Sequence, residues 1–333
     1  MISPSIERRW IDDCFSNRIG KGTHSAIDRL QRFMRMPGHR HYCQMDVRSF
    51  FPSINRRILL GFWNSERERL PHPAQTLRQL DAVAQRIILQ NPTRPKPALS
   101  GDIALLRQIP PHKSLFHAQP GVGLPIGSLT SQFFSHVYLN PLDQFVKHQL
   151  KIKGYLRYVD DLIILGDDPK KLLEQMRQID QFLGDSLQLQ LHPDKTVLQR
   201  VDQGANFLGY IAFPHHTYVR ERSLRALRQR LYFFNHLLDP AHYPHRAMPQ
   251  RGTWAQWLAL HQLAPPLAPH PIILKRMLAT LNSYYGQLGH ANSYHLRRKV
   301  YHDMLGSIKR YFLPADARYA KLRIKPVWLF SSP

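Results

Sequence analysis

The chain has 333 residues, of which 43% are hydrophobic and 21% charged, so it can bury a sizeable core and fold as two or three subdomains. Its 46 Lys and Arg against 23 Asp and Glu give a formal net charge of +23, which suits a polyanionic partner such as RNA or DNA. No apolar run approaches the roughly 18 residues of a membrane-spanning helix, and no secretory signal peptide precedes the first polar stretch, so we expect no membrane partner. Cys14 and Cys43 are too few for a disulfide framework or a zinc site, and we expect both to be reduced in a cytoplasmic protein.

Residues 1 to about 40 are expected to be rich in helix. Within Ser25–Met34 the apolar side chains recur at helical spacing, at Ile27, Leu30, Phe33 and Met34. The turn before them, Arg18-Ile19-Gly20-Lys21-Gly22, is basic. Taken alone, that turn is compatible with a solvated loop.

The next predicted element is a strand that ends in an acid. His41 to Met45 leads into Asp46, and a turn and a helix follow, with Pro52 and Ser53 near the start of the helix. Further on, Gln75 to Gln90 predicts an amphipathic helix, and a proline- and lysine-rich segment runs from Pro92 to Ser100. We interpret residues 64–120 as an insertion.

The 19 histidines of the chain lie mainly in proline-rich loops, for example His112 and His117, without the spacing of metal ligands. We therefore interpret them as compositional bias. After them comes a loop with three glycines, Gly121 to Gln132, and a largely apolar helix is predicted from Phe133 to about Leu150. Glycines let a backbone approach a ligand closely, and a helix N-terminus favours anions.

Tyr158-Val159-Asp160-Asp161 is the most informative motif. It lies between the apolar runs Tyr155–Val159 and Leu162–Leu165, which predicts a β-hairpin whose tight turn carries two acids. A solvated Asp-Asp turn is one reading, but adjacent desolvated carboxylates repel each other and favour a divalent metal. If this hairpin pairs with the strand that ends at Asp46, three carboxylates converge and can hold two Mg²⁺ ions, roughly 3.5–4 Å apart, for in-line phosphoryl transfer.

Beyond the hairpin, Asp168 and Pro169 predict an N-cap and the first residue of a helix that runs to roughly Phe182, so Asp167 and Asp168 are expected to be capping or surface acids. Leu187, Leu189 and Leu191 alternate with polar residues as in a half-buried strand. From about 215 the chain predicts three amphipathic helices with apolar stripes and an extended tail over 314–333. The stripes are Leu224, Leu227, Leu231, Phe234 and Leu238; Ile273, Met277, Leu281 and Tyr284; and Leu296, Val300, Met304 and Ile308.

Five motifs in this order resemble those of the reverse transcriptase family, over roughly residues 10 to 300. They are Asp46 with Phe51; Leu124-Pro125-Ile126-Gly127 with Ser131-Gln132; Tyr158-Val159-Asp160-Asp161; His192-Pro193-Asp194-Lys195-Thr196; and Asn206-Phe207-Leu208-Gly209-Tyr210. The resemblance implies an α+β fold, a right-handed polymerase palm with partial fingers and a C-terminal helical thumb. It divides the chain into partial fingers over 1–40, a palm and fingers core over 41–213, a thumb over 214–313 and the tail.

The resemblance also implies the activity, an RNA-directed DNA polymerase (nucleotidyltransferase) that extends a primer 3′-hydroxyl with dNTPs, and the residues that carry it. Asp46, Asp160 and Asp161 would be catalytic and, with the Val47 backbone, would bind two Mg²⁺ ions, for which Mn²⁺ can substitute; Lys195 would assist departure of pyrophosphate. The nucleotide-binding set is Arg18, Ser49, Phe50, Phe51, Ile126, Gly127 and Tyr158. The primer- and template-binding set is Ser131, Gln132, Phe207, Leu208, Gly209 and Tyr210. The partners would be an RNA template, a DNA or RNA primer, dNTPs and a small basic accessory protein.

Within the family, Ile126-Gly127-Ser128-Leu129-Thr130-Ser131-Gln132 resembles the enzymes of diversity-generating retroelements, which are error-prone opposite adenine. A group II intron-like or phage-defence reverse transcriptase is the alternative within enzymes. Relatives carry tens of residues, including a fingers hairpin with triphosphate-binding cations, before the turn at Arg18–Gly22. Here the turn comes almost at once, so we expect a start codon placed too late, a second chain that supplies the missing piece, or a weak or inactive polymerase-derived RNA-binding protein.

Overall fold

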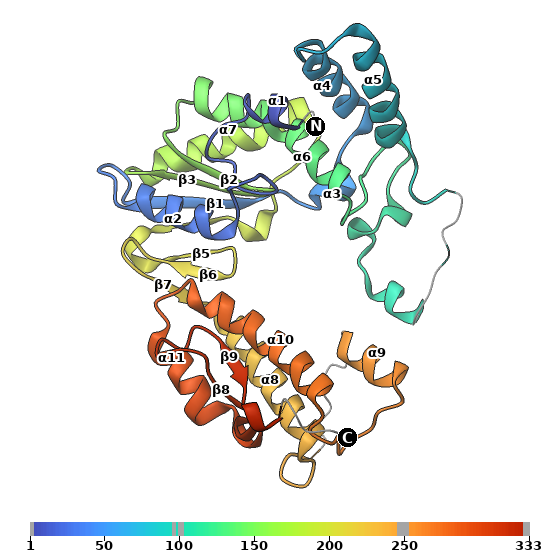
Figure 1. Ribbon diagram of the computed structural model, residues 1–333. Coiled ribbons are helices and arrows are strands. Elements are labelled where there is room, and N and C mark those ends of the chain that lie inside the picture. Colours follow the sequence, from blue (N-terminus) through green and yellow to red (C-terminus); the bar gives the residue numbers. More distant parts are fainter. Residues whose placement is uncertain (1–2, 95–97, 99–102, 245–252, 329–333) are drawn as a thin grey trace. The chain divides into compact units, whose positions relative to one another are not determined.

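The structure is a computed structural model that describes residues 3–94, 98, 103–244 and 253–328. The chain divides into two compact units, Met1–Gln203 and Gly204–Pro333. The first unit contains a four-stranded sheet, and the second combines helices with two small sheets (Figure 1). In the described part of the chain, no helix has the length and apolar character that a membrane crossing requires.

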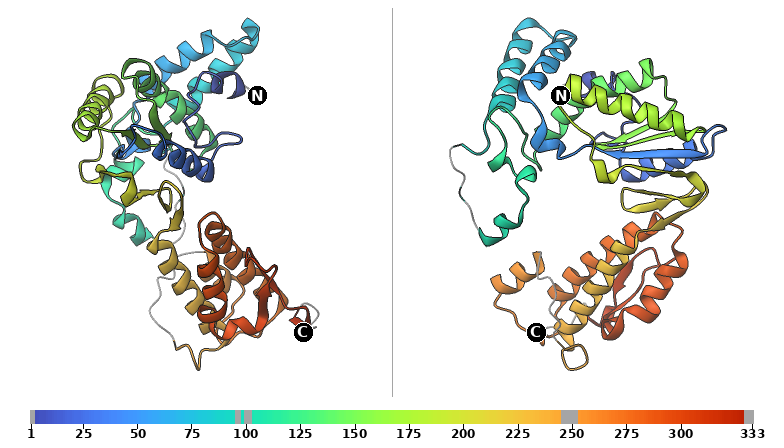
Figure 2. Two further views of the ribbon diagram at one scale, coloured as in Figure 1. Left: turned by 90° about the vertical axis from the view of Figure 1, so that its left-hand side faces the viewer. Right: turned by 180° about the vertical axis from the view of Figure 1, so that it is seen from behind.

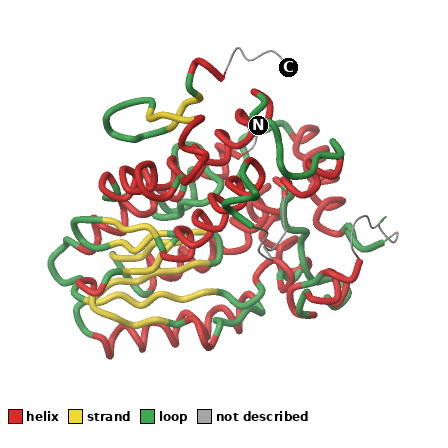
Figure 3. Tube along the Cα trace, turned by 90° about the horizontal axis from the view of Figure 1, so that it is seen from below, coloured by secondary structure: helices red, strands yellow, loops and turns green. Residues whose placement is uncertain are grey.

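The sheet of the first unit consists of β1 (His41–Asp46), β2 (Gly154–Tyr158), β3 (Asp161–Gly166) and β4 (Val197–Arg200). The strand order is β2-β3-β1-β4, and every neighbouring pair is antiparallel. Figure 3 draws the strands in yellow and the helices in red. The predicted hairpin is confirmed, since Tyr158 pairs with Asp161 across a two-residue turn. The predicted pairing of this hairpin with the strand of Asp46 is also confirmed.

Helices cover both sides of this sheet. α6 (Leu129–Gln144) and α7 (Pro169–Leu187) lie on one side, and α2 (Thr23–Met34) lies on the other (Figure 1). Successive strand residues point to opposite faces, so Cys43 and Met45 join the core under α6 and α7 while Tyr42, also buried, faces the other way. The buried stripe of α2 includes the four predicted residues, Ile27, Leu30, Phe33 and Met34.

The remaining helices of the first unit are α1 (Ser3–Glu7), α3 (Phe50–Ser53), α4 (Arg56–Glu68) and α5 (Ala74–Leu89), and α4 and α5 pack against each other (Figure 2). Pro52 and Ser53 lie in a helix, as predicted, but they end the four-residue α3, and the longer helix α4 follows. That helix begins at Arg56 because the Asn55 side chain accepts hydrogen bonds from the backbone of Arg57 and Ile58. Part of the predicted segment Pro92–Ser100 lies outside the described residues, and short helical turns follow it at Ile103–Gln108, Pro111–Lys113 and Leu115–His117.

Two helix boundaries and one strand differ from the prediction. α6 starts at Leu129, four residues earlier, and α7 extends to Leu187, five residues further. The strand predicted at Leu187–Leu191 is wrong, because Leu187 is the buried end of α7 and Gln188 turns the chain with a φ of 51°. Leu191 then makes a single bridge to Val47. The predicted cap is confirmed, since the Asp168 side chain accepts a hydrogen bond from the Lys170 backbone.

The second unit begins with a three-stranded antiparallel sheet, β5 (Ala205–Phe207), β6 (Tyr210–Ala212) and β7 (Thr217–Val219). Its helices are α8 (Glu221–Leu238), α9 (Thr253–Leu260), α10 (Pro271–Gly289) and α11 (Tyr294–Lys299). β8 (Phe312–Pro314) and β9 (Leu322–Ile324) form a hairpin. The segment expected as an extended tail thus contributes two buried side chains, Leu322 and Ile324, to this unit.

The apolar stripes of the second unit largely match the prediction. The buried residue near the end of α8 is Leu237 where Leu238 was predicted, and α10 buries Tyr285 where Tyr284 was predicted. The third predicted helix is not continuous, since α11 passes into a π-helical turn at Val300–Met304 and a 3-10 turn at Gly306–Tyr311.

Candidate active site

Three acidic residues meet at one end of the first unit's sheet. Asp46 is the last residue of β1 and pairs directly with Asp161, the first residue of β3. Directly opposite residues of antiparallel strands have Cβ atoms roughly 4.5–5.5 Å apart. Asp160 lies in the turn beside them, and its backbone oxygen accepts a hydrogen bond from the Val47 nitrogen at 3.1 Å. The His192 nitrogen donates to the Asp46 carbonyl at 2.7 Å, which joins the loop after α7 to the same place.

The acids create local negative charge that Lys195 partly neutralises. Its Nζ atom lies 2.8 Å from Asp46 Oδ1. Burial raises the pKa of Asp160 to about 6, and the nearby Asp46 carboxylate acts in the same direction, while Lys195 opposes the shift. Carboxylate oxygens are the ligands that Mg²⁺ prefers, so the donor set fits such an ion. Among the described residues, however, no three acidic, histidine or cysteine side chains are arranged to hold a metal as they stand.

The turn that carries Asp160 is strained and is held from both sides. Val159 adopts a φ of 55°, a left-handed conformation that is rare for a β-branched residue and costs on the order of 1–3 kcal/mol. The Arg157 Nη1 atom donates to the Val159 carbonyl at 3.0 Å. The Val159 nitrogen donates to Ser16 Oγ, also at 3.0 Å. Both backbone polar groups of the turn residue are therefore fixed by side chains, one from the preceding strand β2 and one from Ser16 in a distant segment.

Arg157 is itself held by a buried ion pair. Its Nε and Nη2 atoms donate to the two carboxylate oxygens of Asp143 at 2.7 and 2.6 Å, and the Tyr155 hydroxyl donates to Asp143 at 2.7 Å. The pair is 1% and 0% exposed, so it links α6 to β2 without contact with water. None of the sequence motifs includes Asp143 or Arg157. The signal was present, because a charged residue inside an apolar strand and another inside an apolar helix must find partners.

His136 completes the support of the turn. Its ring nitrogens lie 3.4 Å from Cys14 Sγ and 3.3 Å from Ser16 Oγ, and its ring packs on Trp10 at a centroid distance of 4.8 Å. Burial and, to a lesser degree, the charge of Arg157 lower the pKa of His136 to about 3, so the ring is neutral. Burial likewise raises the pKa of the Cys14 thiol, as expected for an unreactive core cysteine.

The predicted nucleotide-binding residues have different environments. Ser49 has a φ of 48° and its hydroxyl oxygen is enclosed, whereas Phe51 is partly buried. Phe50 is 2% exposed and its side chain belongs to the core, so only its backbone is left for the predicted nucleotide contact. Ile126 is 71% exposed and Gly127 has a φ of 94°, so this loop is open to solvent. Tyr158 accepts a hydrogen bond at its hydroxyl from Thr23 at 3.3 Å.

Arg18, another of the predicted nucleotide-binding residues, makes several contacts within the first unit. Its guanidinium donates to the backbone oxygens of Ile11, Cys14 and Glu7 at 2.8, 3.1 and 3.3 Å, and its side chain is 10% exposed. These bonds satisfy most of its donors and stabilise the loop after α1. Ser131 is also enclosed, at 3% exposure in the first turn of α6, which leaves Gln132 as the accessible member of that predicted pair.

The predicted primer-binding residues lie in the second unit. Phe207 and Tyr210 are 0% and 2% exposed, and the Tyr210 hydroxyl donates to the Gln287 backbone oxygen at 3.1 Å. Leu208 and Gly209 form the turn between β5 and β6, with φ values of 49° and 92°. The buried pair therefore holds the hairpin in place, and the turn is the part that a ligand could reach.

Acidic side chains collected at the end of an antiparallel sheet, with helices on both faces, define a mixed helix and sheet protein with a reverse-transcriptase-like fold. Residues 5–212 match the model of a family described as reverse transcriptase (RNA-dependent DNA polymerase). The chain belongs to this reverse transcriptase family. None of the curated protein sequences compared with it gave a match.

Solved structures similar to this chain include two yeast telomerases. Apo telomerase from Candida tropicalis has a TM-score of 0.44 and 12% identity, over 89% of this chain and 51% of that one. Telomerase from Candida albicans, in complex with the TWJ fragment of telomeric RNA, has a TM-score of 0.39 and 13% identity, over 89% of this chain and 48% of that one. The chain thus spans about half the length of the telomerase chains it matches.

Proposed function

We propose that the protein is an RNA-directed DNA polymerase that extends a primer 3′-hydroxyl with dNTPs. The observation that carries the proposal is the strand register that sets Asp46 opposite Asp161, with Asp160 in the adjoining turn. Membership of the reverse transcriptase family supports it independently. An RNA template and a nucleic-acid primer are the corresponding partners, and the net charge of +23 favours both.

Asp46, Asp160, Asp161 and the Val47 carbonyl would hold Mg²⁺. Bound there, Mg²⁺ would lower the pKa of the attacking hydroxyl and neutralise charge on the departing pyrophosphate. Lys195 lies beside Asp46, so its ammonium could protonate or stabilise that pyrophosphate. Phe51 would sit under the sugar of the incoming nucleotide, where an aromatic ring excludes a 2′-hydroxyl and selects dNTPs.

In this proposal β1–β4 with α6 and α7 act as the palm, and the helices of the second unit act as the thumb. Arg222, Arg225 and Arg228 are exposed on α8, away from its buried stripe. Cations on such a surface suit the phosphate backbone of a primer–template duplex.

The test is dNTP incorporation on a poly(rA)/oligo(dT) primer–template with Mg²⁺, by the wild type and Asp160→Asn. Incorporation by the wild type alone would support the proposal. Asp46→Asn and Asp161→Asn should also incorporate no dNTP, while both still bind the duplex. Incorporation by any of the three variants would refute the carboxylate assignment. Duplex binding without any incorporation, even in a chain extended upstream, would favour a polymerase-derived RNA-binding protein.

We further propose low fidelity of the retroelement type. Ile126 is exposed and offers shape but no polar group to a nucleotide. The measurement is the sequence of cDNA made by the wild type and by Ile126→Gln. Equal error rates opposite adenine would refute this part.

A further inference from the structure

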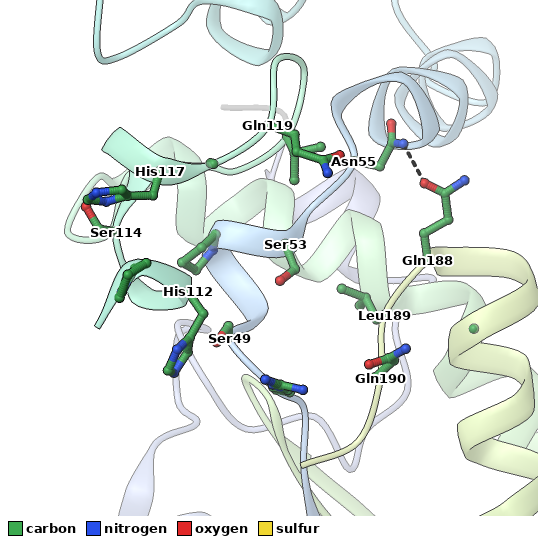
Figure 4. A pocket seen from close by; sticks show the side chains of 16 residues that line it. Ser49, Ser53, Asn55, His112, Ser114, His117, Gln119, Gln188, Leu189 and Gln190 are labelled. Carbon is green, nitrogen blue, oxygen red and sulfur yellow. Dashed lines mark hydrogen bonds between the residues drawn. The ribbon is translucent and has the colours of Figure 1, made fainter. Parts of the chain in front are cut away.

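A pocket of about 590 Å³ with both polar and apolar walls opens beside α3. None of the three acids or Lys195 lines it. Figure 4 shows His112, Ser114 and His117 on one side, from the region interpreted as an insertion, and Ser49 and Ser53 on the other. The stretch after α7, Gln188 to Gln190, closes a further wall (Figure 4).

The walls of this pocket are fixed by specific contacts. Asn55 Nδ2 donates to Gln188 Oε1 at 2.7 Å, which joins the start of α4 to the end of α7 (Figure 4). The Gly123 backbone nitrogen donates a hydrogen bond to the Ile54 carbonyl at 2.8 Å, and Gly123 has a φ of 93°. A Cβ at Gly123 would lie 2.5 Å from Leu115 Cδ2, so the glycine lets the insertion pack tightly against the first unit's core.

The lining is rich in hydrogen-bond donors and lacks acids. Of the described residues that line the pocket, none is Asp or Glu, while Arg48, His112 and His117 are basic. The Arg48 side chain is exposed and makes no ion pair with any described residue. The Ser49 hydroxyl oxygen is enclosed and has no hydrogen-bond partner within the described part of the chain. A histidine ring presents at least one N–H donor in either protonation state, and serine and glutamine add more.

We propose that this pocket binds a phosphate group. Two sources supply this chemistry, namely the triphosphate tail of a nucleotide and a backbone phosphate of a nucleic-acid strand. The inference rests on the proposed function for its choice of ligand, because a polymerase handles both. It assigns a role to His112 and His117, which the sequence had suggested were only compositional bias.

The test is metal-free binding of two probes, sodium tripolyphosphate and an eight-residue oligo(dT), measured by titration calorimetry. The variant is His112→Ala/His117→Ala, whose two side chains are exposed, and His148→Ala is the matched control because His148 is an exposed histidine outside the pocket. We expect the double Ala variant to bind one or both probes with roughly tenfold lower affinity, the loss typical of hydrogen bonds to a charged group. His112→Lys/His117→Lys should instead bind more tightly, with a steeper dependence on salt.

The two arms identify the source of the phosphate. Weaker binding of tripolyphosphate alone would assign the pocket to the nucleotide tail, and weaker binding of oligo(dT) alone would assign it to a strand. Wild-type affinity for both probes in the double Ala variant would overturn the inference, as would an equal loss in His148→Ala. Because the assay contains no Mg²⁺ and no primer, its result is independent of whether the chain polymerises.

Discussion

The buried pair of Arg157 and Asp143 allows stability and site geometry to be tested separately. Arg157→Met leaves the Asp143 carboxylate buried without its cation, and Asp143→Leu leaves the guanidinium buried without its anion. Breaking a fully buried pair in this way costs about 3–5 kcal/mol of unfolding free energy. The double variant removes both charges, so it should be within about 2 kcal/mol of the wild type. Part of that remainder is the Tyr155 hydroxyl, whose lost acceptor costs about 1 kcal/mol.

The assay is hydrogen exchange in urea, read on peptides from β2 and α6, which isolates the first unit from the second. We expect each single variant to lose unfolding free energy and the double variant to recover most of it, which gives a coupling free energy of several kcal/mol. A double variant as unstable as the sum of the singles would refute the reasoning. So would a single variant that exchanges like the wild type.

The same double variant loses the Arg157 bond to the Val159 carbonyl. If the proposed function holds, dNTP incorporation should fall roughly 10-fold to 100-fold although the fold persists, because the turn that carries Asp160 is no longer fixed. Unchanged incorporation by the folded double variant would show that the pair has only a structural role.

Three further outcomes are expected. His136 has a folded-state pKa of about 3, below its unfolded value, so its contribution to stability is present above about pH 6.5 and is lost as the pH falls toward 3. Between pH 7 and pH 4 the urea midpoint of unfolding should therefore fall less steeply for His136→Gln than for the wild type. Parallel slopes for the two proteins would contradict this. Asp160 has a raised pKa of about 6, so its ionisation destabilises the metal-free fold increasingly from about pH 4 to pH 6. Asp160→Asn should therefore raise the melting temperature at pH 7.5 in EDTA and have little effect at pH 4, whereas equal shifts at both values would count against it. Gly306→Ala should destabilise the second unit by about 1–3 kcal/mol, because Gly306 has a φ of 64° and the new Cβ would crowd Tyr243 and Asn235. Gly286 is the control, since it lies in a helix with open space around its Cα. Gly286→Ala should stabilise the second unit by about 0.5–1 kcal/mol, and thermal unfolding measures both effects.

The sequence by itself located the acids and their local setting. Apolar runs on each side of Asp160 and Asp161 predicted the hairpin, and the run before Asp46 predicted its strand, because strand and turn patterns are local properties. The helical stripes of α2, α8 and α10 were predicted for the same reason. Leu187–Leu191 shows where a local pattern fails, since leucines alternate there although the first belongs to a helix end and the last to a single bridge.

Only the tertiary structure decided which neighbours these residues have. The register that sets Asp46 opposite Asp161 joins segments more than a hundred residues apart, as does the contact of Lys195 with Asp46. The pairing of Asp143 with Arg157 is also decided only by the tertiary structure, because charges inside apolar elements indicate that each needs a partner but not which one it finds. The burial of the Phe50 and Arg18 side chains could not be predicted either, since a side chain's accessibility depends on what the rest of the chain packs against it.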